Sequence, residues 1–392
     1  MRLHGTTRRL APLFAAEFLS NFIFWYAVEK FFMRSIGFND ATIGLMVAAY
    51  SAIILICEVP SGILADRWSR KGVLILGYVA LLISAVVCGL SNSETVFLIG
   101  TIFWGIFYAL YSGTNEAIVY DTLLEEEGSG KRYELYFGRL ELVASLGLII
   151  SSIAGGLLSQ ATDLRTTFFW SVPPIILGII ALLFLREPSL HRAEEAVDVR
   201  AHIIATFRAV LRRGALLPIV ISLILVTITT ELFFEMDQLW LIALAAPAAL
   251  YGIINAIVLG SIGFGGVAAA WRKKGLLVAI STALIIISSV CLIFTRNLAV
   301  IVAAFFCLAT ALSALSVVYS KRLHDTLPSK LRAGATSTVS TTGRGLIIPI
   351  VLLFGAISNG ASVFHAAYIV LALAVLILVF VVITMRRPHI AG

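Results

Sequence analysis

The chain has 392 residues, of which 60% are hydrophobic and only 13% are charged. A water-soluble domain needs about a quarter of its residues charged to cover its surface, so the composition excludes an ordinary soluble protein. The net charge of +7 does not indicate a nucleic-acid-binding protein, because the basic residues lie in loops between apolar segments and not along one polar face.

Apolar segments of about 20 residues recur along the whole chain, and each is long enough to cross a hydrocarbon core of about 30 Å. They predict an all-α integral membrane protein with twelve transmembrane helices in two six-helix bundles. A long polar segment separates an N-terminal bundle, residues 1–186, from a C-terminal bundle, residues 215–392, through a cytoplasmic linker, residues 187–214. The predicted spans are 11–33, 41–65, 73–91, 96–121, 136–159, 167–185, 215–241, 249–270, 276–294, 298–320, 335–357 and 365–385.

The first span carries Glu17, Glu29 and Lys30 and has no small-residue cleavage site, so we interpret it as a membrane helix and not as a removable signal peptide. Most lysine and arginine residues lie at the termini, in alternate loops and in the central linker. Lysine and arginine are enriched in cytoplasmic loops, which predicts that both termini and the linker are cytoplasmic.

Several polar side chains fall inside the predicted spans. A charged group at the centre of a membrane helix costs about 2.5–3.5 kcal/mol on insertion scales, so each one requires a reason. In the fourth span polar and aromatic side chains recur at helical spacing, which predicts one face toward a central cavity. Shorter patterns occur in spans 1 and 7. The candidate substrate-binding or proton-binding residues are Glu17, Asn21, Tyr108, Tyr111, Asn115, Glu116, Glu231 and Glu235.

A buried carboxyl group accepts a proton more readily than the same group in water. It can therefore take a proton from one side of the membrane and release it to the other. Our hypothesis is that Glu116, together with Glu231 or Glu235, binds the proton or another coupling cation. The alternative is that some of these acids only pair with a neighbouring base. Arg344 in span 11 is a candidate anchor for an anionic substrate, but its counterpart Arg139 in the first half favours the interpretation that both are structural gate residues.

The second span ends in the segment Gly62-Ile-Leu-Ala-Asp66-Arg67-Trp-Ser-Arg70-Lys71. It resembles the loop between helices 2 and 3 of the major facilitator superfamily of transporters, which has the pattern G-x-L-A-D-R-x-x-R-K. The resemblance implies a secondary transporter with two parallel halves. A changed copy of the segment follows the eighth span, where Ala270 stands at the acidic position.

The resemblance also implies that this loop is a cytoplasmic gate. Gly62 is expected to permit close helix approach, and Asp66 to accept hydrogen bonds from the start of span 11. The basic residues Arg67, Arg70 and Lys71 need acidic partners, and Asp121 at the end of span 4 is the expected one, with residues 125–127 just beyond.

Span 5 contains Gly147, Ser151-Ser152 and Gly155-Gly156. This resembles part of a glycine-rich motif of drug/proton antiporters, although Ser151-Ser152 replaces the expected Gly-Pro. The sequence thus predicts a multi-pass protein of the bacterial inner membrane, monomeric in the lipid bilayer, that exports a small lipophilic or cationic substrate by proton-coupled antiport.

Two alternatives remain open. One is a proton-coupled importer of a sugar, an organic acid or another nutrient, although the cavity faces carry few Asn and Gln side chains. The other is a non-transporting membrane sensor, which would have no need of the acids or the loop signature. An enzyme is not expected, because no phosphate-binding glycine loop with its lysine occurs. No cofactor and no metal are predicted, since no His and Cys ligand spacing is present.

Replacing Asp66 by Ala is expected to reduce transport sharply while leaving expression nearly unchanged, because the gate loses its acidic residue and the helix packing stays intact. Transport into membrane vesicles, normalised to the amount of protein, checks this expectation. Normal transport by the Asp66→Ala variant would contradict a gate function.

Overall fold

The computed structural model describes residues 5–188, 216–271, 273–327 and 329–386. Within these ranges the chain forms helices joined by short loops, without a strand. Eleven helical stretches of the described chain are long and apolar enough to cross a membrane. An interrupted first segment precedes them, and the prediction of an all-α membrane protein is confirmed. Most of the predicted linker lies outside the described residues.

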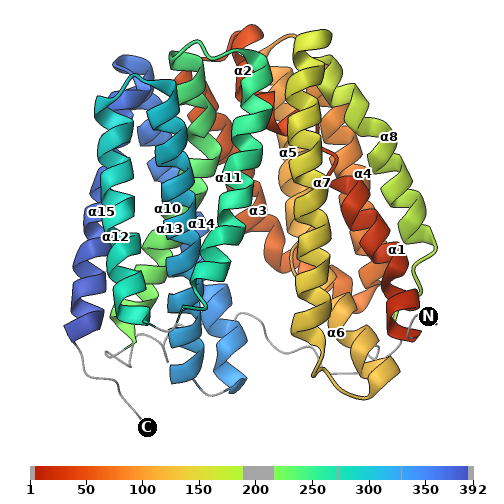
Figure 1. The fold of residues 1–392 in the computed structure, drawn as a ribbon. Coiled ribbons are helices and arrows are strands. Elements are labelled where there is room, and N and C mark those ends of the chain that lie inside the picture. The colour runs from red at the N-terminus through yellow and green to blue at the C-terminus, as the bar shows by residue number, and fades with distance from the viewer. Residues whose placement is uncertain (1–4, 189–215, 272, 328, 387–392) are drawn as a thin grey trace. The chain divides into compact units, whose positions relative to one another are not determined.

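The helices follow the predicted spans in order (Figure 1). In the first half they are α1 (Gly5–Ser20), the 3-10 helix η1 (Tyr26–Val28), α2 (Glu29–Ser35), α3 (Asp40–Arg67), α4 (Arg70–Leu90), α5 (Glu94–Tyr111), α6 (Thr114–Glu127), α7 (Tyr133–Ala161) and α8 (Thr166–Leu183). In the second half they are α10 (Leu217–Ala243), α11 (Ala248–Ala268), α12 (Lys274–Phe294), α13 (Leu298–Thr326), α14 (Ser329–Gly360) and α15 (Val363–Arg386).

The described residues form two compact units. The first contains residues 5–38, 49–188 and 247–256, and the second contains the remaining described residues. The start of α11 therefore belongs to the unit of the N-terminal helices, and the start of α3 to the unit of the C-terminal helices.

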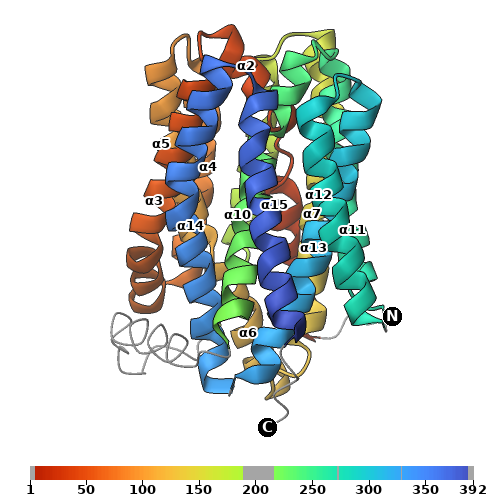
Figure 2. The ribbon, with the colours of Figure 1, turned by 90° about the vertical axis from the view of Figure 1, so that its left-hand side faces the viewer.

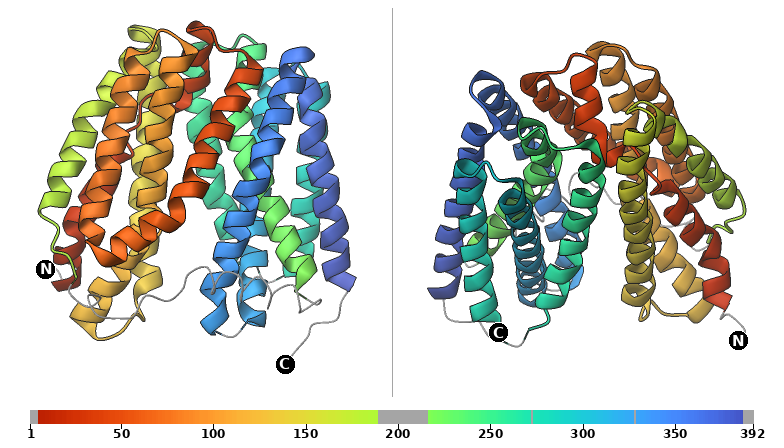
Figure 3. Two further views of the ribbon diagram at one scale, coloured as in Figure 1. Left: turned by 180° about the vertical axis from the view of Figure 1, so that it is seen from behind. Right: turned by 45° about the horizontal axis from the view of Figure 1, so that its top comes forward.

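The predicted first span is not one continuous helix, which corrects the sequence-based expectation. α1 ends at Ser20, and an irregular segment leads to η1 and α2. Neighbouring hydroxyl groups satisfy the exposed backbone of this segment, as membrane proteins require. The Phe24 N–H donates to Ser171 Oγ at 2.9 Å, and Ser151 Oγ donates to the Asn21 carbonyl oxygen at 3.0 Å. Figure 3 shows α1 beside α8, which carries Ser171.

The predicted fourth span is also interrupted. α5 ends at Tyr111 and α6 begins at Thr114, with Gly113 in the left-handed conformation at φ +76°. Glycine adopts this conformation without the steric cost that a Cβ atom brings. The side chains expected on one continuous face, from Tyr108 to Glu116, therefore belong to two helices, and the prediction of one uninterrupted helical face is wrong.

The small residues of α7 pack against the interrupted first span. A Cβ atom added to Gly147 would lie 2.7 Å from the Phe18 carbonyl oxygen, and one added to Gly155 would overlap the Phe24 carbonyl oxygen. On the same helix, Ser152 Oγ accepts a hydrogen bond of 2.9 Å from Asn255 Nδ2 on α11. The glycine and serine motif of span 5 thus brings α7 close to exposed backbone.

In the second unit α10 packs against α13, α14 and α15 (Figure 2). Trp240 on α10 is buried, and its Nε1 donates to the Leu292 carbonyl oxygen at 3.0 Å. The first residues of α3 pack on α14, where Ser358 Oγ donates to Asp40 Oδ2 at 2.6 Å. A Cβ atom on Gly44 would lie 2.6 Å from the Val351 carbonyl oxygen, so this contact also depends on glycine.

We expect Gly155→Ala to destabilise the protein by about 1–3 kcal/mol, because the added methyl group forces α7 away from the first span. Gly138→Ala on the same helix is the matched control, since its Cβ would meet nothing within 4 Å. Thermal unfolding in detergent measures both variants. Equal unfolding temperatures would show that the close approach at Gly155 is not required.

Candidate functional site

The centre of the candidate site is the Glu17 carboxylate, which lies in the last turn of α1 and is fully buried. Its Oε1 atom accepts hydrogen bonds from Tyr111 Oη at 2.5 Å and from Asn21 Nδ2 at 3.2 Å. Its Oε2 atom accepts from Asn115 Nδ2 at 3.0 Å and from Tyr78 Oη at 3.4 Å. Each of these four donors is a neutral group.

Three of the four donors lie beside a helix break, and the fourth, Tyr78, comes from the continuous helix α4. Tyr111 is the last residue of α5 and Asn115 lies in the first turn of α6, so they flank the break at Gly113. Tyr78 lies in α4, where its hydroxyl also accepts a hydrogen bond of 3.0 Å from Ser20 Oγ. The carboxylate therefore connects α1, α4, α5 and α6 within the first unit.

The structure brings together four of the predicted site residues, namely Glu17, Asn21, Tyr111 and Asn115. Tyr108 is not among them, since it is 37% exposed and its ring packs against Trp104 and Phe107. Tyr78 is not among the predicted site residues, because its span contains no charged residue that would have drawn attention to it. The sequence signal that could have found it is a hydroxyl-bearing aromatic residue inside an otherwise apolar span.

Glu116 lies outside the Glu17 cluster, with an exposed side chain on α6. A second acid that the sequence reasoning missed, Glu141 on α7, interacts electrostatically with both Glu17 and Glu116. It is an acid within a predicted span, which is the signal that singled out the other candidates. The structure thus arranges three carboxyl groups on α1, α7 and α6, with Glu17 the most deeply buried of them.

The acids of span 7 lie in the second unit. Glu231 and Glu235 are half-buried on α10, and Glu231 interacts electrostatically with Glu235 and with Arg344 of α14. A Cβ atom on Gly343 would lie 3.2 Å from Thr227 Cγ2, which shows that α14 runs close to the same face of α10. Arg344 is thus the basic neighbour of the predicted acidic site.

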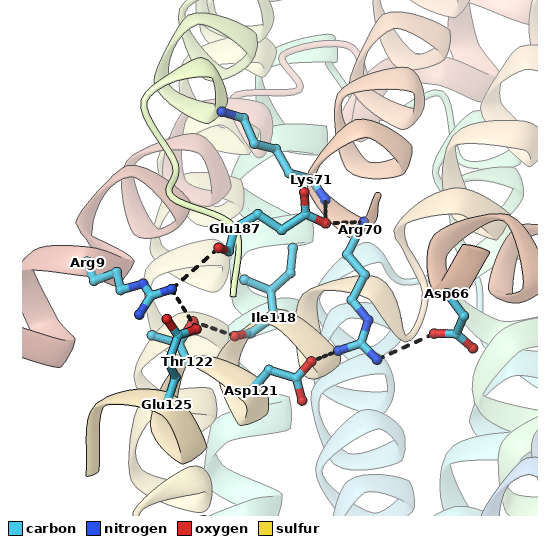
Figure 4. A network of polar contacts seen from close by, with 9 residues as sticks. All are labelled: Arg9, Asp66, Arg70, Lys71, Ile118, Asp121, Thr122, Glu125 and Glu187. Atoms are coloured by element: carbon cyan, nitrogen blue, oxygen red, sulfur yellow. Dashed lines mark hydrogen bonds and ion pairs between the residues drawn. The ribbon is translucent and has the colours of Figure 1, made fainter. Parts of the chain in front are cut away.

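The signature loop forms a polar network around Arg70 (Figure 4). Its guanidinium group pairs with Asp121 of α6, the expected partner, and with Asp66 at 3.4 Å. The Asp121 side chain is 5% exposed, so this pair is largely removed from solvent, whereas the Asp66 side chain is 69% exposed. The Lys71 side chain donates instead to the Leu183 carbonyl oxygen at 2.7 Å.

Glu187, which follows α8, caps the start of α4. Its carboxylate accepts hydrogen bonds from Ser69 Oγ at 2.7 Å, from the Arg70 N–H at 2.6 Å and from the Lys71 N–H at 3.4 Å. A negative charge at a helix N-terminus is stabilised by the unpaired N–H groups and by the helix dipole. The sequence reasoning treated Glu187 as a linker residue and so did not identify this role.

The acids after Asp121 do not serve the signature loop, which corrects a further expectation. Glu125 and Glu126 pair with Arg9 of α1 at 2.9 and 2.8 Å. The Arg9 guanidinium also donates to the Glu187 carbonyl oxygen at 3.4 Å. Glu127 accepts a hydrogen bond from Thr6 at 2.9 Å. These contacts attach the start of α1 to α6.

Gly62 does not show the close helix approach that was expected. A Cβ atom at this position would meet nothing within 4 Å in the described structure, and the neighbouring Arg67 is exposed. The contact between Asp66 and the start of span 11 stays a prediction, because it would join the two units. The described residues contain no group of three or more His, Cys, Asp or Glu side chains that could hold a metal ion.

Comparisons with known proteins agree with this architecture. The sequence pattern of the Major Facilitator Superfamily matches residues 10–267. The class H tetracycline resistance protein of Pasteurella multocida is 25% identical over 327 residues, which cover 79% of this chain and 78% of that protein. Multidrug resistance protein 2 of Bacillus subtilis is 27% identical over 172 residues, but this match spans only 44% of this chain and 41% of that protein.

Two solved structures illustrate the likeness of fold. The nucleoside transporter NupG superposes with a TM-score of 0.77 at 14% identity, covering 97% of this chain and 98% of that chain. A bacterial homolog of the human lysosomal transporter Spinster, in an inward-facing and occupied conformation, gives a TM-score of 0.71 at 14% identity, covering 98% and 97%. At such identities the likeness concerns the fold alone.

Replacing Arg70 by Ala is expected to lower the free energy of unfolding by about 1–3 kcal/mol, because the buried Asp121 carboxylate loses this cation. Arg67→Ala removes an equal charge from an exposed position of the same loop and should be nearly neutral. Thermal unfolding of the two variants in detergent checks the difference. If Arg67→Ala is as destabilising as Arg70→Ala, the total positive charge of the loop determines the stability, and the Arg70–Asp121 pair does not.

Proposed function

We propose that this chain, which belongs to the Major Facilitator Superfamily of membrane transporters, exports small lipophilic or cationic compounds in exchange for protons. The bacterial inner membrane is the proposed location, with both termini in the cytoplasm. The observation that carries the proposal is the environment of Glu17, a fully buried carboxylate whose four hydrogen-bond donors are all neutral.

A buried charge is costly unless a partner or a proton neutralises it. The hydrogen bonds to Glu17 spread its negative charge over neutral dipoles, but they bring no positive charge to it. Glu141 adds a repulsive interaction from α7. Among the described contacts, Glu17 therefore has donors that stabilise the anion and a neighbour that opposes it. Such a group can gain or lose a proton when its surroundings change. Coupling of substrate transport to proton movement requires a group of this kind.

Exchange follows if proton and substrate compete for the same negative charge. A cationic substrate is attracted while Glu17 is ionised, and a proton on Glu17 removes that attraction. Uptake of a proton from outside then favours release of the substrate to that side. The acids of α10 beside Arg344 are a second candidate site for a charge in this cycle, and the signature loop is the proposed cytoplasmic gate.

The names of the relatives support export over import. One is named a tetracycline resistance protein and another a multidrug resistance protein. The partial glycine motif of α7 points the same way. An importer of a nutrient is the competing assignment, and it predicts accumulation of a solute with inward proton flow.

The test uses purified protein in proteoliposomes with an imposed pH gradient. A panel of cationic dyes and a panel of sugars are the candidate substrates. We expect dye movement against the proton flow in the unmodified protein. Glu17→Gln should reduce the rate of proton-driven dye transport at least about tenfold, because Gln cannot carry the proton. Exchange of dye without a pH gradient should continue.

Glu116→Gln is the matched control, since Glu116 lies outside the cluster and its side chain is exposed. It should retain coupled transport. Sugar uptake driven by inward protons would contradict the export proposal. Unchanged coupling in Glu17→Gln would remove Glu17 as the proton site.

A further inference from the structure

We propose that the Asn115 carboxamide senses whether Glu17 is protonated, and that this sets the conformation of the break between α5 and α6 at Gly113. The inference rests on the proposed function, because it explains how a bound proton could move a helix. It assigns to Asn115 a positioning role.

Asn115 is an unusual partner for Glu17. It is only 3% exposed, and its Nδ2 atom donates to Glu17 Oε2 at 3.0 Å. Its Oδ1 atom is buried and has no hydrogen-bond partner among the residues that the structure describes. A buried acceptor without a partner costs about 1–3 kcal/mol. The observed orientation of the carboxamide therefore favours the ionised form of Glu17 at the expense of its own oxygen.

Protonation changes what Glu17 requires. A carboxylic acid has one O–H donor and needs an acceptor, which an NH₂ group cannot provide. Of the other neighbours, Tyr111 donates to the opposite oxygen atom, Oε1. Tyr78 Oη accepts from Ser20 Oγ, and Asn21 Nδ2 also donates to the Glu17 backbone carbonyl oxygen at 2.8 Å. A half-turn of the Asn115 carboxamide brings its unpaired Oδ1 to the new donor.

The balance of the step is simple. A proton from water forms an O–H bond at Glu17 Oε2, the Nδ2 hydrogen bond from Asn115 is lost, and an O–H to Oδ1 hydrogen bond replaces it. The Nδ2 group then occupies the place that Oδ1 held. Loss of the proton to water reverses each change.

The link to the helix break follows from where the partners lie. Tyr111 and Asn115 stand on either side of Gly113 and bind different oxygen atoms of one carboxylate. The carboxylate thus joins the end of α5 to the start of α6. Gly113 has a positive φ, and a Cβ added to it would meet nothing within 4 Å, so neighbouring side chains leave room for the break to change.

The other titratable groups that face Glu17 are few in the described structure. They are Tyr78 of α4, Tyr111 of α5 and Glu141 of α7, while Glu116 of α6 interacts with Glu141. α8 also packs against α1, and its sequence contains no titratable side chain. Glu141 interacts electrostatically with Glu17, but it lies on neither side of the α5–α6 break.

The experiment follows the break through a distance measured across it. Spin labels replace the exposed residues Ile102 on α5 and Tyr120 on α6, in a background in which Cys57, Cys88, Cys291 and Cys307 are replaced by Ala. The distance between the labels is recorded against pH without substrate. We expect a pH-dependent shift in the unmodified protein, and the low-pH distance at every pH in Glu17→Gln.

Asn115→Leu removes the carboxamide and should lose the pH-dependent shift. Asn115→Ala is the second, smaller variant in case Leu does not fit. Asn21→Leu is the matched control, because Asn21 also donates to Glu17 but from the residue that follows α1 and not from the α5–α6 break, so the shift should remain at a changed midpoint. A pH-dependent shift that persists without Asn115, or that persists in Glu17→Gln, overturns the inference.

The outcome is separate from that of the transport assay. If the label distance depends on Glu17 and Asn115 while dye export is not coupled to protons, the proposed function fails and the sensing role of Asn115 stands. If export is proton-coupled and the pH dependence of the label distance is the same with and without the Asn115 side chain, only this inference fails. An unmodified protein whose label distance does not change with pH also overturns it.

Discussion

The structure of the first unit depends on one constraint, which is that a carboxylate in the interior of a membrane protein needs donors from every side. A regular transmembrane helix has no spare N–H groups along its backbone, so side chains must supply the donors. Glu17 obtains them from Asn21, which follows α1, and from α4, α5 and α6. The breaks after Ser20 and at Gly113 lie beside this carboxylate, and they place Asn21, Tyr111 and Asn115 around it.

Interrupting a helix exposes backbone groups, and the neighbours of the first span show how they are accommodated. Ser171 and Ser151 hydrogen-bond to the irregular segment, while Gly147 and Gly155 allow α7 to approach its carbonyl oxygens. The small-residue motif of span 5 thus has a specific task in this chain. Serine in place of the Gly-Pro pair fits that task, since Ser151 supplies a hydroxyl donor that neither Gly nor Pro provides.

Hydropathy and motif spacing predicted the helices, their order and the family, because the length of a membrane span and the chemistry of the signature loop are encoded locally. The same signals could not reveal the two breaks. An apolar segment remains apolar when its helix is interrupted, and a single glycine such as Gly113 does not predict its own φ. The hypothesis for span 4 assumed one continuous helix, whereas the break at Gly113 places Tyr111 on α5 and Glu116 on α6.

Tyr78, Glu141 and Glu187 were missed for a related reason. Each has its role because it contacts a residue that is distant in the sequence, and no local sequence pattern predicts such a contact. Glu187 caps α4 although more than a hundred residues separate them, and Tyr78 meets Glu17 across two helices. The signature loop was simpler to interpret, since its chemistry already required an acid such as Asp121.

The short helix α6 connects the two polar regions of the first unit. Asn115 in its first turn binds Glu17, whereas Asp121, Glu125 and Glu126 further along bind Arg70 and Arg9. The six residue steps from Asn115 to Asp121 span about 9 Å at the helical rise of 1.5 Å per residue. A helix this short transmits a rotation at one end to the other with little bending. The proposed change in how Asn115 meets Glu17 would therefore reach the Arg70–Asp121 pair through α6, which links the proposed proton site to the signature loop.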